Sequence, residues 1–565
     1  MGGTTPGPRG HRESTWWSAG DGSRRVERPG HTTVLIGQCL ATDEQVRRAE
    51  GDLGRLMSFP GAYSAVLVDE TGEVTLVADA AAQFPLFVSA TGQHVVFGSE
   101  ARAVAGRTAA EPDLVALAAQ VVALFVDRTA FSGVHQLEPG SALRMGAHGT
   151  TRLTVTSLAA DAGKTLGECA DELRECLVTA IEARSTTSAA LSSDFSGGLD
   201  STSLAFLATR HADPLPVVTF AQADAPVDDD LRHAQRYATL DARLRHHVVT
   251  GGPEHLPYRD WLSGADQPHS SRLAMGPTGL QTSTVASLGC DTHFVGEGGD
   301  LVLGAPLGYF IDLARRGELT TLWRHCTAWG RLRHRSPLSL FTRSVRLAST
   351  SRRRSLLMLA RQLGHGAFAR SWEEHNITPW GGPMCDWLAP PAREALAEHL
   401  VVLAGEADDG MDAGDRATMS QLKSAGGTQQ AVRETGARHG VTVHAPFLDA
   451  RVVRTCLSLA AWRRCDPAGP KPLLRKALSG LVPEVVLSRR TKGDYTGAAH
   501  LGVRRNMPAL RKLMENPVSA ELGLIEPRRV REALTLAARG IETPWASLNQ
   551  VLAIELWLRE VMGRA

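Results

Sequence analysis

One short run of the chain, residues 196–202, has the residue types of a phosphate-binding turn. An apolar run at 189–191 precedes it and a helical pattern at 203–208 follows it, so the order is strand, glycine turn, helix. Such a turn directs backbone N–H groups at one point, where the helix N-terminus adds partial positive charge. Two adjacent glycines allow close backbone approach and positive φ. The candidate binding residues are Ser196, Gly197, Gly198, Leu199, Asp200, Ser201 and Thr202.

The pattern Ser-Gly-Gly-x-Asp-Ser in this run resembles the pyrophosphate loop of ATP-pyrophosphatases. Those enzymes cleave ATP to AMP and pyrophosphate and activate a carboxylate or carbonyl group as its adenylate. The run differs from a Walker loop because no Gly-Lys-Ser/Thr follows it. A carboxylate at Asp200, beside phosphates, makes sense mainly as a ligand of Mg²⁺. The alternative is a strand-to-helix turn whose glycines serve geometry alone.

A second glycine turn, residues 296–300, follows the predicted strand at Thr292–Val295. Strands and helices alternate between the two turns, which predicts a parallel sheet with both turns at the carboxyl ends of its strands. Two carboxylates on one rim, Asp200 and Asp300, repel each other unless a cation compensates. Mg²⁺ and ATP are therefore the predicted cofactors, and the alternative is a pair of capping or solvated aspartates.

The same turn, Gly-Glu-Gly-Gly-Asp, resembles the Ser-Gly-Glu-Gly-Ala-Asp-Glu turn of asparagine synthetases, although Leu301 replaces its last acidic residue. The resemblance implies that Asp300 is the second Mg²⁺ ligand. It also implies that Glu297 orients or deprotonates an attacking amine, which requires a suitably placed nucleophile. Alternatively, Glu297 stabilises the loop through hydrogen bonds and takes no part in the chemistry.

Two of the six lysines lie in further segments of this resemblance. Lys492 lies in Arg-Arg-Thr-Lys-Gly-Asp-Tyr, which matches an Arg-x-x-Lys segment and implies a cation that stabilises the developing charge on pyrophosphate and the acyl transition state. Lys471 begins a Lys-x-x-Leu-Arg match, and a solvated surface role is equally open for it. The segment 443–449 resembles a Val-Pro-Phe-Leu-Asp segment that forms a wall, although His444 could touch the substrate.

Short strands with glycine turns between them are predicted from Thr32 to Ala105, which is typical of an antiparallel layer. Their order resembles the N-terminal amidotransferase domain of asparagine synthetases, which releases ammonia from glutamine. That type uses a cysteine directly after the initiator methionine, where this chain has Gly2, and the Asn-Gly-Glu block that binds glutamine is absent. Cys39 reads as an apolar strand thiol rather than a relocated nucleophile. Residues 31–150 are therefore predicted to be an inactive glutaminase-like domain.

The 565 residues are enough for more than one domain. The predicted fold class is α/β, with a degenerate N-terminal amidotransferase-like (Ntn) antiparallel β domain and a C-terminal ATP-pyrophosphatase domain that has a parallel sheet and many helices. Residues 1–30, rich in Gly, Pro, Arg, Ser and Thr, are predicted to be a disordered lead-in. Residues 165–565 are predicted to be the adenylating domain.

The bulk composition excludes some classes of partner. The hydrophobic content of 43% is ordinary for a globular protein, and the net charge of +1 gives no reason to expect nucleic acid or an acidic membrane surface. The sequence has no apolar stretch long enough to span a membrane and no apolar signal core. Its eight cysteines are scattered without a Cys-x-x-Cys pair, which favours reduced thiols and a cytoplasmic protein.

Within the superfamily, the chain resembles lasso-peptide cyclases, through Gly-x-Gly-Gly-Asp and through His-Ala-Pro-Phe-Leu-Asp followed by Arg-Arg-Thr-Lys-Gly-Asp-Tyr. It implies an ATP-dependent macrolactam synthetase that adenylates an Asp or Glu side chain of a leader-free core peptide, joins it to the peptide N-terminal amine, and releases AMP and pyrophosphate. The precursor peptide is the implied substrate, with a leader-binding protein and a leader peptidase as partners. Three alternatives are a β-lactam or other small-molecule amide synthetase, an asparagine synthetase-like enzyme without glutaminase activity, and a catalytically dead scaffold. Glu297 argues against the β-lactam branch, which has tyrosine there.

Overall fold

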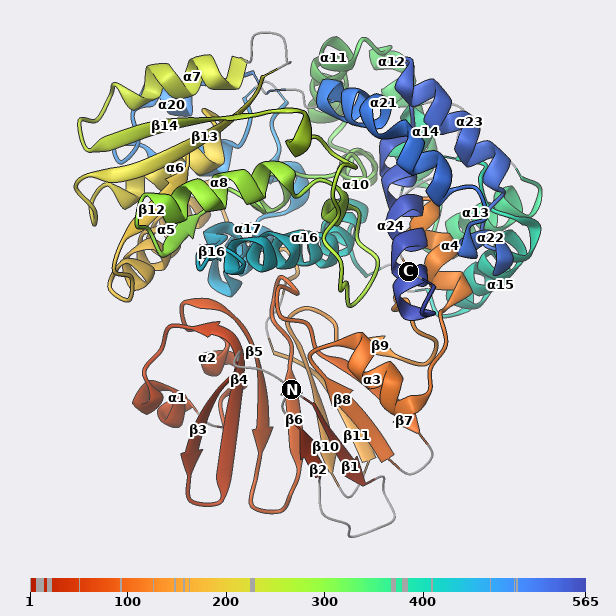
Figure 1. Ribbon diagram of the computed structural model, residues 1–565, viewed down its shortest axis with the longest axis horizontal. Coiled ribbons are helices and arrows are strands. Elements are labelled where there is room, and N and C mark those ends of the chain that lie inside the picture. The colour runs from red at the N-terminus through yellow and green to blue at the C-terminus, as the bar shows by residue number, and fades with distance from the viewer. Residues whose placement is uncertain are drawn as a thin grey trace.

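The computed structural model contains three β-sheets and a large helical part (Figure 1). It describes residues 2–6, 15–17, 23–49, 51–91, 94–124, 126–146, 149–155, 158–161, 163–223, 229–366, 372–378, 385–407, 410–467, 469–491, 493 and 496–564. Two of the sheets are antiparallel and belong to the N-terminal part, and the third is parallel. The predicted fold class, with antiparallel N-terminal sheets and a C-terminal parallel sheet among many helices, is confirmed.

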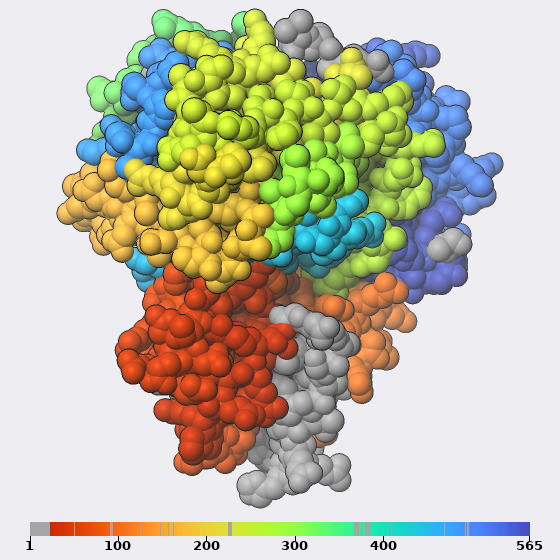
Figure 2. Space-filling model, turned by 60° about the vertical axis from the view of Figure 1, so that its left-hand side comes forward, coloured from red at the N-terminus to blue at the C-terminus, as the bar shows by residue number. Residues whose placement is uncertain are grey.

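The two N-terminal sheets form one end of the molecule, in red and orange in Figures 1 and 2. One has the order β2-β1-β8-β7-β9 and the other β11-β10-β6-β5-β4-β3. The strands are β1 (Gly2–Pro6), β2 (Thr15–Trp17), β3 (Ser23–Arg28), β4 (His31–Cys39), β5 (Gly61–Val68), β6 (Val74–Val77), β7 (Phe87–Thr91), β8 (His94–Gly98), β9 (His135–Gln136), β10 (Ser141–Gly146) and β11 (Gly149–Thr154). Apolar cross-strand pairs such as Val34 with Val66, and Val66 with Leu76, set the register.

Part of the predicted lead-in is structured, which corrects the prediction of disorder over residues 1–30. Ser23–Arg28 pairs along its whole length with His31–Cys39, through a turn at Gly30 with φ of +77°. Gly2–Pro6 lies between β8 and β2. Strand pairing satisfies the backbone groups of these segments regardless of their polar composition, and the remaining residues of the lead-in lie outside the described ones.

The parallel sheet has the order β14-β13-β12-β15-β16, and every neighbouring pair runs parallel. Its strands are β12 (Leu191–Asp194), β13 (Leu215–Gln222), β14 (Leu244–Gly251), β15 (Thr292–Phe294) and β16 (Thr442–His444). The helices that connect and cover it are α5 (Leu166–Ser185), α6 (Leu199–Ala208), α7 (Asp229–Ala238), α8 (Gly276–Ser287) and α9 (Gly299–Leu303). α5 begins with a capping box between Thr165 and Glu168, which agrees with the predicted helix there.

Helices make up most of the remaining chain, and many of them lie on the right of Figure 1. They are α10 (Tyr309–Arg315), α11 (Leu319–Arg333), α12 (Pro337–Ala348), α13 (Arg352–Gly364), α14 (Trp372–Asn376), α15 (Pro390–Gly405), α16 (Ala413–Ala437), α17 (Ala450–Ser458), α18 (Ala461–Arg464), α19 (Pro472–Leu478), α20 (Glu484–Leu487), α21 (Thr496–Leu513), α22 (Val518–Glu521), α23 (Pro527–Ala538) and α24 (Trp545–Val561). Within the described residues, no helix is long and apolar enough to cross a membrane.

The N-terminal part is joined to the rest of the chain by shared cores. Its helices are α1 (Asp43–Ala49), α2 (Leu53–Leu56), α3 (Ala101–Thr108) and α4 (Leu114–Val121). α4 packs against α15 and α24, and in Figure 1 it lies among the C-terminal helices. Ala80 and Ala81, in the loop after β6, are fully buried in the core of the parallel sheet. The N-terminal sheets therefore contribute side chains directly to the part that carries the two glycine turns.

Candidate active site

The first glycine turn follows β12 and leads into α6, as the sequence predicts. Gly197 has φ of +78°, and a Cβ there would meet the backbone of α7, with Ala234 N at 2.8 Å. Ser201 fixes the turn from inside, because its Oγ accepts from Ser196 N at 3.2 Å and lies 2.9 Å from Ser196 Oγ. Gly198 is the N-cap of α6. The first N–H groups of a helix have no partner within it, so this turn offers phosphate donors in a fixed backbone.

The second turn packs directly against the first. Gly296 has no room for a side chain, because a Cβ there would lie 2.7 Å from Ser201 N. A Cβ on Gly299 would collide with the carboxylate of Asp200. Gly298, with φ of +86°, caps α9, and a Cβ there would collide with Leu448. Glycines at 296 and 299 are thus required for Asp200 to lie over the start of α9, and glycine at 298 is required for Leu448 to pack against this turn.

Lys471 joins the two aspartates that the sequence predicts as Mg²⁺ ligands. Its Nζ contacts Asp200 Oδ2 and lies 2.7 Å from Asp300 Oδ1. Burial alone would lower the pKa of Lys471, but the two carboxylates outweigh that effect and raise it above its ordinary value. The residue has φ of +54° at the N-cap of α19, a left-handed conformation that costs free energy and is found preferentially at functional sites. The ammonium group therefore balances two carboxylates whose side chains are 13% and 62% exposed.

These two carboxylates fit a magnesium ion that is bound together with phosphates. Among the described residues, no group of three or more His, Cys, Asp or Glu side chains could hold a metal by itself. Mg²⁺ takes one or two carboxylates and completes its shell with water and substrate phosphates. The Lys471 ammonium stands where a cation is needed between Asp200 and Asp300. The donor set thus suits Mg²⁺ with a nucleotide better than a dedicated protein metal cage.

Glu297 lies in the second turn and is half-buried, and Asp300 is exposed at the same rim. Lys492 lies outside the described residues, so its predicted role stays a prediction. The described residues on either side of it are anchored to the start of α7. Thr491 Oγ1 donates to Asp229 at 2.8 Å, and Gly493 N donates to Asp230 Oδ1 at 3.2 Å.

The anchor of this segment is itself buried. The Arg489 guanidinium donates to Asp230, and both side chains are at most 9% exposed. Asp230 also contributes the backbone carbonyl that faces Gly197. Arg489, Thr491 and Gly493 are therefore held against the helix that packs on the first turn, a link between distant segments that the sequence alone did not indicate.

Thr202 differs from the other candidates in the first turn. Its side chain is fully buried, and its Oγ1 has no hydrogen-bond partner among the described residues. Leu199 is 8% exposed and packs in the core of the parallel sheet. Any contact of these two residues with a nucleotide would therefore come from their backbone groups rather than from their side chains.

The segment 443–449, which the resemblance predicts to be a wall, is buried throughout. Arg184 binds Asp449 with two hydrogen bonds of 2.8 and 2.7 Å, and both side chains are buried. Arg184 Nε also donates to Nδ1 of His444 at 2.9 Å. Burial lowers the pKa of His444 well below its ordinary value, followed in size by the effect of the Arg184 charge. His444 is therefore a neutral structural residue of this wall.

A side chain from the N-terminal part supports the second turn. Gln83 is 3% exposed, and its Nε2 donates to the backbone carbonyl of Leu448 at 3.0 Å. The Leu448 side chain is the one that lies against Gly298. Arg433 donates to the Gln83 carbonyl at 2.9 Å and stacks over Phe84 at 3.9 Å. No motif marked Gln83, because its partners lie hundreds of residues away.

The surroundings of Cys39 do not suit a nucleophilic thiolate. It is 9% exposed within a hydrophobic cluster with Leu35 and Tyr63, and burial raises the pKa of its thiol. A nucleophilic cysteine needs a thiolate, which a lowered pKa and an electropositive site favour. Cys39 is the only cysteine in the first 165 residues. This supports its interpretation as a strand thiol.

Comparison with known proteins identifies the family. Residues 172–559 match the family model described as asparagine synthase, and no curated protein matches the chain. Among solved structures, the chain is similar to one described as the allosteric regulatory enzyme of purine biosynthesis, with 11% identity and a TM-score of 0.17, over 43% of this chain and 65% of that one. A second is glutamine phosphoribosylpyrophosphate amidotransferase from B. subtilis complexed with ADP and GMP, with 12% identity and a TM-score of 0.17, over 48% and 72%.

At these TM-scores the two structures support no conclusion about this chain, whereas the family match covers both glycine turns, Lys471 and the wall at 443–449. Members of the matched family form amide bonds with ATP, release AMP and typically use Mg²⁺. The chain belongs to the asparagine synthase family and is an ATP-dependent, AMP-forming amide ligase.

Proposed function

We propose that this chain is a macrolactam synthetase of the lasso-peptide type, which joins an Asp or Glu side chain of a leader-free core peptide to the peptide's own N-terminal amine. The observation that carries the proposal is the convergence of Asp200 and Asp300 on Lys471 where the two glycine turns meet. This convergence supports an adenylating rim at that point. The choice of a peptide rests on the similarity of residues 296–300, 444–449 and 489–495 to lasso-peptide cyclases.

The first step of the proposed reaction activates the carboxylate. An oxygen of the peptide side-chain carboxylate attacks the α-phosphorus of ATP, and the bond to the β-phosphate oxygen breaks, so that pyrophosphate leaves. The turn from Ser196 to Ser201 binds the phosphates, while Lys471 and Lys492 offset the charge that develops on the leaving group. Mg²⁺, held by Asp200 and Asp300, would screen the phosphate charge.

The second step forms the amide. The N-terminal amine attacks the acyl carbon, the bond to the AMP oxygen breaks, and the amine proton passes to the carboxylate of Glu297. An amine already present on the substrate needs no ammonia source, which agrees with the buried thiol of Cys39. Holding both ends of one peptide in one site makes the reaction effectively intramolecular. A leader-binding protein and a leader peptidase would deliver the peptide and expose its amine.

The test combines pyrophosphate exchange with product mass. Core peptides that carry one acidic side chain, encoded beside the gene, are incubated with ATP and Mg²⁺. We expect peptide-dependent ATP–pyrophosphate exchange, AMP release, and a product lighter than the peptide by one water. Asp200→Asn should abolish exchange, and Asp171→Asn, an exposed carboxylate on α5, should not.

Two results would contradict the proposal. Exchange supported by small amino acids but by no peptide would identify a small-molecule amide synthetase instead. If neither an acidic peptide nor a small carboxylate supports exchange, the chain is only a binding scaffold.

A further inference from the structure

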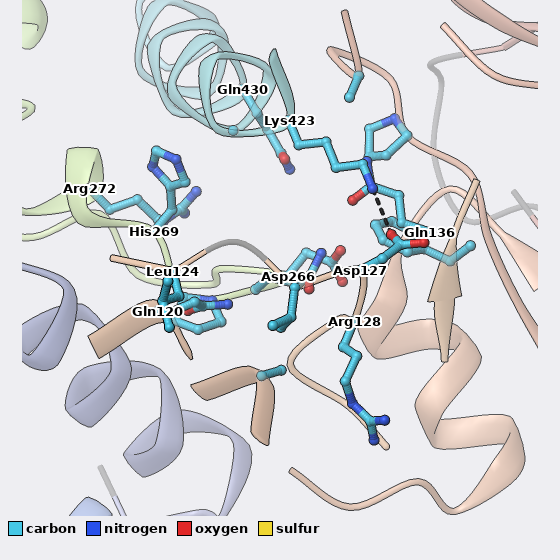
Figure 3. A pocket seen from close by; sticks show the side chains of 18 residues that line it. Gln120, Leu124, Asp127, Arg128, Gln136, Asp266, His269, Arg272, Lys423 and Gln430 are labelled. Atoms are coloured by element: carbon cyan, nitrogen blue, oxygen red, sulfur yellow. Dashed lines mark hydrogen bonds and ion pairs between the residues drawn. The ribbon is translucent and has the colours of Figure 1, made fainter. Parts of the chain in front are cut away.

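A cavity of about 170 Å³ lies where the N-terminal sheets, the segment before the short helix Ser270–Leu273, and α16 meet (Figure 3). One water needs only about 10–15 Å³ of such space, so the cavity has room for a larger ligand. Phe87 and Leu124 contribute apolar surface. The cavity lies apart from the two glycine turns, and none of the residues of either turn lines it.

The charged groups in the walls already have partners: carboxylates pair with Lys423 and Arg272, and Asp266 accepts from backbone N–H groups. Lys423, at 11% exposure, has its Nζ 2.7 Å from Asp127 Oδ1, and Figure 3 shows this pair on one side of the cavity. Arg272, at 8% exposure, pairs with Glu434 at 2.8 Å. A ligand with a net charge would have to break one of these pairs and leave a poorly solvated charge behind. The walls therefore favour a neutral ligand.

Carboxamide side chains supply the hydrogen-bonding capacity that remains. Gln120 and Gln267 each accept a hydrogen bond with Oε1, at 2.8 and 3.0 Å, which leaves their Nε2 groups as donors within the described part of the chain. Gln430, on α16, donates with Nε2 to Glu434 at 3.0 Å, which leaves its Oε1 as an acceptor there. In Figure 3, Gln430 and Gln120 lie on different walls of the cavity. The carboxamides are Gln120, Gln136, Gln267 and Gln430.

We propose that this cavity binds peptide amide groups and holds a stretch of the peptide substrate that is remote from the reacting carboxylate and amine. Each peptide unit carries one N–H donor and one carbonyl acceptor and has no net charge, which complements separate donors and acceptors on opposite walls. The identity of the peptide as substrate rests on the proposed function. Binding energy from such a remote segment serves to position the reacting groups.

The cavity also shares a wall with the support of the second glycine turn. Ala82 lines it, with φ of +52°, and the next residue, Gln83, holds Leu448 against Gly298. A peptide segment in the cavity therefore lies against the loop that positions the turn carrying Glu297. This arrangement connects remote binding to the reacting centre through packed residues.

The first experiment measures binding without any reaction. The neutral blocked dipeptide N-acetyl-Gly-Gly-amide is titrated into the full chain by ligand-observed NMR, and a Kd in the millimolar range is expected for about a dozen heavy atoms. Loss of two hydrogen bonds in Gln120→Leu/Gln430→Leu should raise the Kd by roughly tenfold or more. Gln45→Leu, an exposed carboxamide on α1, is the matched control and should leave it unchanged. If the double variant folds poorly, Gln430→Met alone replaces it in the titration, and its unfolding midpoint is measured in parallel to show that it folds.

Two outcomes overturn the assignment of the cavity: equal Kd values for wild type and variants, or tighter binding of the charged dipeptide Gly-Gly than of the blocked one. A second arm measures exchange driven by an acidic core peptide. The double variant should raise the peptide KM about tenfold at nearly constant kcat. An unchanged KM refutes the substrate role while the exchange itself upholds the proposed function. If the wild type shows no exchange with any peptide, the proposed function fails, and the substrate role fails with it.

Discussion

The side-chain amide of Gln83 donates to the backbone carbonyl of Leu448 at 3.0 Å, across 365 positions of sequence. Gln83 belongs to the N-terminal part, and Leu448 belongs to the wall that lies against Gly298. Because Gln83 is only 3% exposed, the bond forms in a region of low dielectric where an unpaired carbonyl is costly. The N-terminal sheets therefore keep a structural role at the adenylating site.

Gln83→Leu should loosen the second turn. Removal of the donor leaves the Leu448 carbonyl buried without it, which should lower the free energy of unfolding by about 1–3 kcal/mol. A shift of Asp300, which lies in the same turn and would hold Mg²⁺ during adenylation, should also lower the exchange rate by roughly tenfold, which corresponds to about 1.4 kcal/mol in the barrier. Urea unfolding and ATP–pyrophosphate exchange measure the two effects.

The matched control for this change is Asn506→Leu. Asn506 is 8% exposed and donates to the Pro257 carbonyl at 3.2 Å, in the helical part. Asn506→Leu should lower the free energy of unfolding by a similar amount but leave the exchange rate unchanged. If Gln83→Leu also keeps the exchange rate, the bond holds the fold together but does not position the turn.

Lys471→Met should separate metal binding from catalysis. In the wild type the ammonium satisfies Asp200 and Asp300, so Mg²⁺ without nucleotide has to compete with it. The variant should bind Mg²⁺ alone more tightly, yet lose roughly 100-fold or more in exchange rate, because the phosphates lose a fixed cation. Titration calorimetry with Mg²⁺ and the exchange assay test both parts. Lys476→Met, exposed on the same helix, should change neither.

The pKa of Lys471 gives a further check on this assignment. The carboxylates of Asp200 and Asp300 raise it, despite burial, so the group keeps its charge through the neutral range. Mg²⁺ affinity of the wild type should therefore not rise between pH 6 and 9 through loss of this proton. A rise that Lys471→Met removes would mean that the ammonium titrates in that range.

The strands and turns were predictable from the sequence because their signals are local. Apolar runs followed by glycine predicted β12, β14 and β15, and an apolar run without glycine predicted β13. The strand–turn–helix order predicted the rim that Asp200 and Asp300 share. Ser23–Arg28 was missed because its polar composition resembles that of a disordered segment, whereas its pairing with His31–Cys39 depends on the neighbouring strand.

Contacts between distant segments could not be predicted in the same way. Lys471 is 271 positions from Asp200, and nothing in its own segment shows which carboxylates it meets. The same holds for Gln83 and Leu448. The burial of individual side chains could not be predicted either, because Thr202 belongs to the motif and yet its side chain is buried in the core. A motif fixes the residue types of a turn, whereas packing decides which side chains reach the ligand.

Thr202→Val tests that distinction. Valine keeps the shape and removes a buried hydroxyl that lacks a partner among the described residues. The free energy of unfolding should therefore stay constant or rise by up to about 1 kcal/mol, and the exchange rate should not change. Ser201→Ala, which removes the bonds to Ser196, should lower the exchange rate. A fall in the rate for Thr202→Val would show that its hydroxyl does reach the nucleotide.

Asp79 should make stability depend on pH through the loop that carries Gln83. Its carboxylate accepts from Gln83 N at 2.7 Å, and burial raises its pKa from 3.8 to about 7. Because the folded-state pKa lies above the unfolded value, folding favours the protonated form. The stabilisation linked to this proton is complete below about pH 4 and is lost as the pH rises to about 7.

Asp79→Asn carries no titrating group at this position, so its unfolding free energy should fall less steeply than that of the wild type between pH 4 and 7. Urea unfolding across this range gives the difference between the two proteins, and that difference is independent of other titrating groups they share. Asp171→Asn, exposed on α5, should reproduce the wild-type slope. Equal slopes for all three proteins would mean that Asp79 remains ionised in the folded protein, with the backbone N–H groups of its loop and Arg433 compensating its charge.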